Sequence, residues 1–130
     1  MAYYLDTSTL VKLVVVESET EALRTWLNEA ERTPVACDLA RTELLRAVRR
    51  AAPDRILQAR AVLDSITLIE IPTQTFEEAG RVDPSLLRTL DAIHLASALD
   101  LGEDLDGFVT YDERLAQAAR LNAIPTLAPA

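Results

Sequence analysis

The sequence predicts an α/β protein, a three-layer α/β/α sandwich around a mainly parallel central sheet. Short apolar segments typical of buried strands alternate along the chain with amphipathic segments of helical period. This alternation is typical of parallel sheets, in which a helix crosses over between successive strands. A chain of 130 residues can bury one hydrophobic core but not two. We therefore expect a single domain spanning residues 1–130.

The expected strands and helices follow one another in a regular order. Strands are predicted over residues 2–5, 35–37, 67–71 and 108–111, with a short edge strand at 125–127. Helices are predicted over residues 7–16, 38–51, 73–82, 89–101 and 113–121, and two more have apolar positions that run from Leu23 to Ala30 and from Ile56 to Leu63.

Most of these helices have a local signal at one end. Thr7 or Ser8 can cap the first helix, and residues 18–21 have the spacing of a capping box for the second. Pro34 is expected to separate the second helix from the next strand, and Pro53 suits the first turn of a helix. Gly102 can end the helix predicted over residues 89–101.

Composition narrows the class of protein. No apolar run approaches the roughly 20 residues that a membrane span requires. The single cysteine, Cys37, cannot form an internal disulfide, which fits a reducing compartment. The first residues, MAYYLDTST, show no basic start followed by a long apolar stretch. We therefore expect a cytoplasmic protein that does not contact a membrane.

The charge is unevenly distributed along the chain. The formal net charge of −8 argues against binding of nucleic acid by bulk electrostatics. Residues 41–60 nevertheless contain six arginines against Glu43 and Asp54, a local charge of +4. A basic strip of this kind can contact phosphates, so it is a candidate RNA path. A solvated helix face explains it equally well.

Acidic side chains stand where three of the predicted strands end. Asp6 follows the first strand, Asp38 the second and Asp112 the fourth, with Thr110 just before it. Ligands of open parallel sheets bind beyond the carboxyl ends of the strands, so this edge is the expected site. Helix capping is the alternative: it explains Asp6 and Asp112 as well as a functional role does, and it is favoured for Asp38.

Asp91 is more informative because of the helix in which it lies. Residues 90–101 contain eight apolar residues, so this helix is expected to be buried nearly all round. Buried carboxylates are rare unless they are paired, hydrogen-bonded or bound to a metal, which favours a functional role for Asp91. His94 lies one turn further on the same face. For His94 a hydrogen bond to a neighbour is favoured over metal ligation.

Glu43 completes a set of four acids from four segments. Its alternative is a surface pair with Arg46 or Arg50 on its own helix. Carboxylates brought together repel and raise one another's pKa, and a hard divalent cation such as Mg²⁺ or Mn²⁺ relieves that repulsion. A site of this kind supports hydrolysis of phosphodiester bonds.

Four segments resemble the PIN-domain nucleases, with the closest likeness to the VapC-type ribonuclease toxins. They are residues 4–8 (YLDTS), 41–46 (RTELLR), 90–96 (LDAIHLA) and 109–112 (VTYD), in order and at suitable spacing. The likeness covers essentially the whole chain. The segments DAIHLA and TYD are the more specific parts.

The resemblance implies a PIN-like fold and a Mg²⁺- or Mn²⁺-dependent endoribonuclease, the toxin of a toxin–antitoxin pair. Its metal ligands would match Asp6, Glu43, Asp91 and Asp112, and Thr110 would hold a ligand or a metal-bound water. It also implies a homodimer and a small antitoxin partner that blocks the site.

Three other classes of protein are weighed against this one, of which a receiver-like signalling domain is disfavoured because the single lysine, Lys12, stands early in the chain. A PIN-like binding module without turnover is disfavoured because all four acids are intact. A phosphatase-like domain with Asp6 as nucleophile is disfavoured because Ser8 stands where a second aspartate is expected and no lysine follows late in the chain.

Overall fold

A computed structural model describes residues 1–130 and shows a five-stranded sheet in which every pair of neighbouring strands is parallel. The strands are β1 (Ala2–Leu5), β2 (Thr33–Cys37), β3 (Thr67–Ile69), β4 (Leu105–Val109) and β5 (Thr126–Leu127). The helices are α1 (Thr7–Lys12), α2 (Thr20–Asn28), α3 (Leu39–Ala51), α4 (Ile56–Ser65), α5 (Thr73–Ala79), α6 (Thr89–Leu99) and α7 (Glu113–Leu121). Two short 3₁₀ helices, Pro53–Arg55 and Gly102–Asp104, precede α4 and β4.

The strand order places a reversal of the chain path next to β1. The order across the sheet is β3-β2-β1-β4-β5, so the chain builds outward from β1 in one direction and then returns to its other side. Open α/β sheets bind their ligands at such a reversal, outside the carboxyl ends of the strands. In this protein that point lies beyond the ends of β1 and β4.

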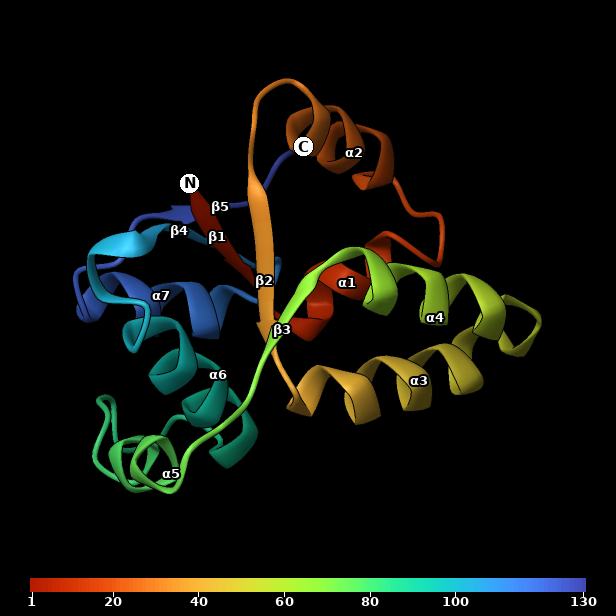
Figure 1. Cartoon of the computed structure of the whole chain (residues 1–130). Coiled ribbons are helices and arrows are strands. Elements are labelled where there is room, and N and C mark those ends of the chain that lie inside the picture. The colour runs from red at the N-terminus through yellow and green to blue at the C-terminus, as the bar shows by residue number, and fades with distance from the viewer.

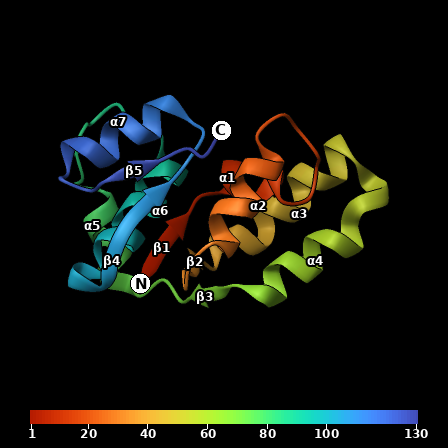
Figure 2. The same ribbon diagram turned by 90° about the horizontal axis from the view of Figure 1, so that it is seen from above.

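Helices cover both faces of the sheet. Figures 1 and 2 show α1 to α4 on one side of the strands and α5 to α7 on the other. Successive strand residues supply the two cores: Leu5 and Val109 pack with helices α1 to α4, and Tyr4 and Phe108 pack with α6 and α7. Side chains of a strand point alternately to opposite faces, which explains this division. The predicted three-layer α/β/α class is confirmed.

Strands β2 and β4 both begin earlier than the sequence-based expectation, and β4 also ends earlier. The fourth strand ends at Val109, because its partner strand β1 ends opposite it at Leu5, and it begins earlier than predicted. Strand β2 begins at Thr33 and includes Pro34, which was expected to lie before the strand. Pairing of β2 with β3 starts only at Val35, so the missing N–H of Pro34 removes no ladder bond on that side.

The start of the chain's second helix is also different. The hydroxyl of Ser18 donates to its neighbour Glu19 and does not cap a helix, so the predicted capping box is wrong. Helix α2 begins at Thr20, whose hydroxyl donates to the carbonyl of Lys12 at 2.7 Å. This bond joins the start of α2 to the end of α1, which stops at Lys12 and does not continue to Val16.

The expected N-terminal caps of helices α1 and α3 are wrong. Helix α1 is capped by Asp6 and not by Thr7 or Ser8, because the Asp6 carboxylate accepts from the backbone N–H of Thr9. Asp38 was expected to cap α3, but its side chain makes no capping bond and pairs with the guanidinium of Arg41 at 2.9 Å. Its helical backbone angles (φ −57°, ψ −21°) lie outside the extended region usual for a cap.

The remaining helices match their predicted positions closely. Helix α7 has the expected bounds, while α5 and α6 end earlier than predicted and β3 ends at Ile69. None of the helices combines the length and the apolar character needed to cross a membrane.

The tight packing of β4 against its neighbours leads to a prediction about Gly107. A Cβ atom there would lie 2.6 Å from the Leu127 side chain and 3.2 Å from the Tyr3 ring. The end of the leucine can rotate away from one methyl group, so we expect Gly107→Ala to change stability little. Gly107→Val adds atoms against both neighbours and should lower the free energy of unfolding by about 1–3 kcal/mol. Urea denaturation of the three proteins measures this, and a valine variant as stable as wild type would contradict it.

Candidate active site

The carboxylate of Asp6 lies at the end of β1 and is 3% exposed. Its Oδ1 accepts hydrogen bonds from the Ser8 hydroxyl (2.8 Å), the Thr9 backbone N–H (3.1 Å) and the Thr9 hydroxyl (3.0 Å). Its Oδ2 accepts a bond from the Thr110 hydroxyl at 2.7 Å. Burial raises the pKa of Asp6, and the bonds from Thr110, Ser8 and Thr9 partly offset that rise. This carboxylate is therefore held rigidly.

Thr110 connects the end of β4 with that of β1. Its hydroxyl donates to Asp6 and accepts from the backbone N–H of Asp112 at 3.0 Å. A second connection runs from the backbone N–H of Tyr111 to the hydroxyl of Ser8 at 3.1 Å. The two loops that follow β1 and β4 are thus joined where the chain reverses its path across the sheet.

Asp112 lies at the start of α7 and caps that helix. Its Oδ1 accepts from the backbone N–H groups of Arg114 (2.9 Å) and Leu115 (3.1 Å). Asp6 and Asp112 are therefore both helix caps, the alternative that the sequence left open for each. Capping uses one oxygen of Asp112 and leaves its Oδ2 without a hydrogen-bond partner in the protein, so capping does not exclude a second role.

Asp91 lies in the first turn of α6 and differs from the other acids. It is half-buried, and its carboxylate makes no hydrogen bond or ion pair. Burial raises the pKa of Asp91, and the negative charges of Asp112 and Asp6 raise it further, against the opposing effects of His94 and Arg88. Asp91 is therefore close enough to two other site acids to be repelled by both.

Glu43 faces the same region from α3 but is balanced by a histidine. Its Oε1 accepts from the Thr7 hydroxyl at 2.7 Å and from the Nε2 of His94 at 2.5 Å. The predicted alternative, a pair with Arg46 or Arg50, is not formed. Burial would raise the pKa of Glu43, but its contacts with His94 and Thr7 outweigh burial and lower it.

His94 is a site residue that the sequence did not identify as one. It is 2% exposed, and its Nδ1 lies 2.7 Å from the hydroxyl of Tyr4, which also accepts the backbone N–H of Cys37. Burial alone would lower the pKa of His94, but contacts with Cys37 and Glu43 raise it to about 10. The expected hydrogen-bonded histidine is confirmed. The spacing of three residues between Asp91 and His94 indicated that both share one face of the helix. The contact of His94 with Glu43 had no such signal, because Glu43 is distant in sequence.

The acids fit a hard divalent cation by the chemistry of their donors. Asp6, Asp91, Asp112 and Glu43 offer carboxylate oxygens, the ligands that Mg²⁺ and Mn²⁺ prefer. Only Glu43 has a cationic partner among the described contacts, and the remaining repulsion raises the pKa of Asp91. The structure contains no preformed group of three or more His, Cys, Asp or Glu side chains at ligand spacing. Water molecules or side-chain rotation would complete such a site.

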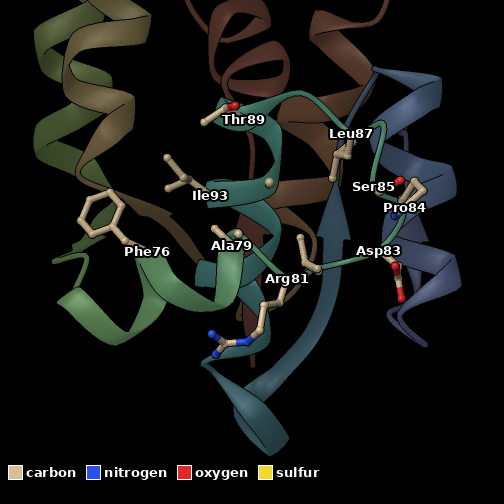
Figure 3. Close-up of a pocket in the computed structure, with 12 residues that line it drawn as sticks. Phe76, Ala79, Arg81, Asp83, Pro84, Ser85, Leu87, Thr89 and Ile93 are labelled. Carbon is tan, nitrogen blue, oxygen red and sulfur yellow. The ribbon is translucent and has the colours of Figure 1, made fainter.

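Two cavities lie on either side of the loop before α6. One, of about 620 Å³, is lined by Asp91 together with Arg88, Arg114 and Leu121. The other, of about 360 Å³, lies between α5 and α6 and is drawn in Figure 3. None of the four acids lines this second cavity, so it is not part of the carboxylate site.

Comparison with known proteins identifies the class to which this fold and site belong. The profile described as PIN domain matches residues 3–121. The chain therefore belongs to the PIN-domain family, whose nucleases are generally metal-dependent. The chain is 40% identical to Ribonuclease VapC46 of Mycobacterium tuberculosis over 128 residues, which cover 98% of each chain. The resemblance to VapC-type PIN ribonucleases, and with it the predicted class of enzyme, is confirmed.

Solved structures agree with this fold. The crystal structure of Mycobacterium tuberculosis VapC20, a toxin that cleaves the sarcin–ricin loop, has a TM-score of 0.73 at 15% identity and covers 89% of this chain and 94% of its own. A toxin–antitoxin complex from Klebsiella pneumoniae has a TM-score of 0.66 at 17% identity, with 86% and 88% covered. At these identities the comparison supports the PIN-like fold alone.

The isolation of Asp91 leads to a prediction about pH. Its folded-state pKa is raised, so the folded protein binds this proton more tightly than the unfolded chain does. Ionisation of Asp91 therefore lowers the free energy of unfolding at high pH, and this cost disappears as the pH falls through the folded-state pKa. In chelator, Asp91→Asn should melt at or above the wild-type temperature at pH 7.

Melting curves in chelator between pH 4 and 8 measure this effect. The advantage of the variant should shrink toward low pH. Asp64→Asn, which changes an exposed acid of α4 that makes no hydrogen bond, is the matched control and should show no such trend. A variant that melts well below wild type at pH 7 would mean that Asp91 stabilises the fold.

Proposed function

We propose that this chain is the toxin of a toxin–antitoxin pair and acts as a Mg²⁺- or Mn²⁺-dependent endoribonuclease. The observation that carries the proposal is the connection between the ends of β1 and β4, where Thr110 joins the carboxylate of Asp6 to the backbone of Asp112, with Asp91 beside them. The family supplies the reaction class, since its relatives include VapC ribonucleases. The proposed unit is the single domain of residues 1–130.

Asp6, Asp91, Asp112 and Glu43 would hold the ion. When bound, a divalent ion of this kind supplies a water of lowered pKa and shields the charge that gathers on the phosphate oxygens. The chain's own contribution is to fix the acids around it. Thr110 orients Asp6 through its Oδ2, and Asp112 is fixed through its Oδ1 by the first turn of α7. His94 holds Oε1 of Glu43 and leaves Oε2 available.

The geometry disfavours a phosphatase-like reaction with Asp6 as nucleophile. Ser8 stands where a second aspartate is expected, and its hydroxyl donates to Oδ1 of Asp6 at 2.8 Å, so no carboxylic acid is placed two residues on to act as the general acid. A PIN-like binding module without turnover is the second candidate. The cleavage experiment below separates it from an enzyme.

Cleavage of RNA tests the enzyme. Purified protein incubated with mixed cellular RNA should cut it in Mg²⁺ or Mn²⁺ and not in chelator. Asp6→Asn and Asp91→Asn should each lower the rate by more than about a hundredfold, the scale on which electrostatic contacts at a reacting group matter. The control Asp64→Asn should cut like wild type.

Binding of metal can be checked without turnover. A hundredfold excess of Mn²⁺ over its Kd should raise the free energy of unfolding of wild type by about 2.7 kcal/mol, and that of Asp91→Asn by much less. Metal binding without cleavage of any RNA would favour the binding module. If the protein neither binds metal nor cleaves RNA, the proposed function is contradicted.

We also propose two protein partners, a small antitoxin and a second copy of this chain, with which it forms a homodimer. The proposed location of the protein is the cytoplasm. Three site carboxylates lack a cationic partner in the structure, and an arginine can pair two carboxylate oxygens at once. An antitoxin segment that carries such a residue suits this site. The fold relative from Klebsiella pneumoniae was solved as a toxin–antitoxin complex.

Co-expression with the neighbouring small reading frame tests this partnership. We expect a stable complex whose RNA cleavage is suppressed, and recovery of cleavage when the partner is removed. If no complex forms and cleavage is unaffected, the toxin assignment fails while the nuclease assignment stands.

A further inference from the structure

The cavity of about 620 Å³ combines two arginines with apolar side chains. Arg88 precedes α6 and Arg114 lies in the first turn of α7, and both are exposed. Neither guanidinium takes part in any of the ion pairs of the protein. Two cationic groups in a concave surface of a strongly acidic protein are therefore available to an anionic ligand.

This cavity borders the carboxylate site directly. Asp91 is one of its lining residues, and Arg88 is close enough to Asp91 to oppose the rise of its pKa. On the other wall, the backbone N–H of Arg114 donates to Asp112 at 2.9 Å. A ligand that fills the cavity would thus reach the site at which the phosphodiester bond is to be cut.

The apolar part of the cavity is exposed to solvent. Leu86 is 93% exposed and Leu121 is 65% exposed, although both are large aliphatic side chains. Guanidinium groups recognise phosphates and also stack on unpaired bases of RNA, and apolar side chains can hold a base that is turned out of its stack. The volume lies within the range of about 300–1,000 Å³ that small ligands occupy. This combination suits a nucleotide.

We propose that this cavity binds a nucleotide of single-stranded RNA adjacent to the bond that is cut. Arg88 and Arg114 contact its phosphates, and Leu86 and Leu121 contact its base. The proposal rests on the proposed ribonuclease function and adds the place and the chemistry of substrate binding.

Other arginines of the chain are less well placed for this role. Arg46, Arg49 and Arg60, from the basic segment that the sequence indicated as an RNA path, line a separate cavity of about 440 Å³ that includes none of the four acids. Arg81 lines the cavity of Figure 3, on the far side of the loop before α6. These residues provide controls of equal charge.

The test measures RNA binding in chelator, so that cleavage does not interfere. Fluorescence anisotropy gives the Kd of labelled single-stranded RNA of mixed sequence at several KCl concentrations. We expect Arg88→Ala and Arg114→Ala each to raise the Kd about threefold to fivefold, the effect of one exposed ion pair. The double variant should reduce the slope of log Kd against log salt by about 1.4, since each contact to a single-strand phosphate contributes about 0.7. Arg81→Ala should match wild type.

A second comparison tests the base contact. Leu86→Ala should weaken binding of RNA but not of an abasic strand of the same length. Leu86 and both arginines are exposed, so unchanged melting temperatures are expected and verify that each variant is folded.

Several outcomes would overturn the proposal. One is that Arg88→Ala/Arg114→Ala binds RNA like wild type. A second is that only Arg46→Ala/Arg49→Ala loses affinity for RNA. Another is unchanged RNA binding with loss of the antitoxin complex or of the dimer, which would make the cavity a protein interface. Absence of any RNA binding by wild type would also overturn it. Binding without metal-dependent cleavage would instead contradict the proposed function and leave the cavity assignment intact.

Discussion

The buried carboxylate of Asp6 is the constraint on which the rest of the site depends. A buried charge is costly unless its oxygens are hydrogen-bonded, and here donors from Ser8, Thr9 and Thr110 satisfy them. These donors belong to two segments that are about a hundred residues apart in the chain and are brought together by the pairing of β1 with β4. The sheet thus positions the donors, and the donors fix the acid at the edge of the sheet.

The four acids are stabilised to different degrees. Asp6 has hydrogen bonds at both oxygens, Asp112 has the N-terminus of α7, and Glu43 has the imidazole of His94. Asp91 has none of these. The electrostatic repulsion within the cluster is therefore concentrated on one half-buried residue of α6. A cation that bound beside Asp91 would relieve most of this repulsion. The hydrogen bonds keep the other acids rigid, and the repulsion on Asp91 favours binding of a metal.

The sequence predicted the parts of this arrangement that local patterns control. Asp6 was identified from its place after an apolar segment, and Asp91 from the nearly unbroken apolar character of α6. The contact between His94 and Glu43 was not predicted, because 51 residues separate the two and their distance is set by how α6 and α3 each pack against β2. The start of β4 was missed because Asp106 and Gly107 hide its strand pattern. At position 107 a side chain larger than a methyl group would press against Leu127 and Tyr3, which favours a small residue there.

The short range of electrostatic forces in salt explains how an acidic protein can act on an anionic polymer. The net charge of −8 is spread over the whole surface, and physiological salt screens exposed charges beyond about 8 Å. An RNA strand at the site therefore responds to the few charges nearest to it. Arg88 is close enough to Asp91 to oppose the rise of its pKa, and Arg114 follows Asp112 in the first turn of α7, so the chain brings two arginines to this wall of the site although neither forms an ion pair there. A divalent ion on the acids would cancel two further negative charges, so the potential that RNA meets at the site would be far less negative than the net charge of −8 suggests.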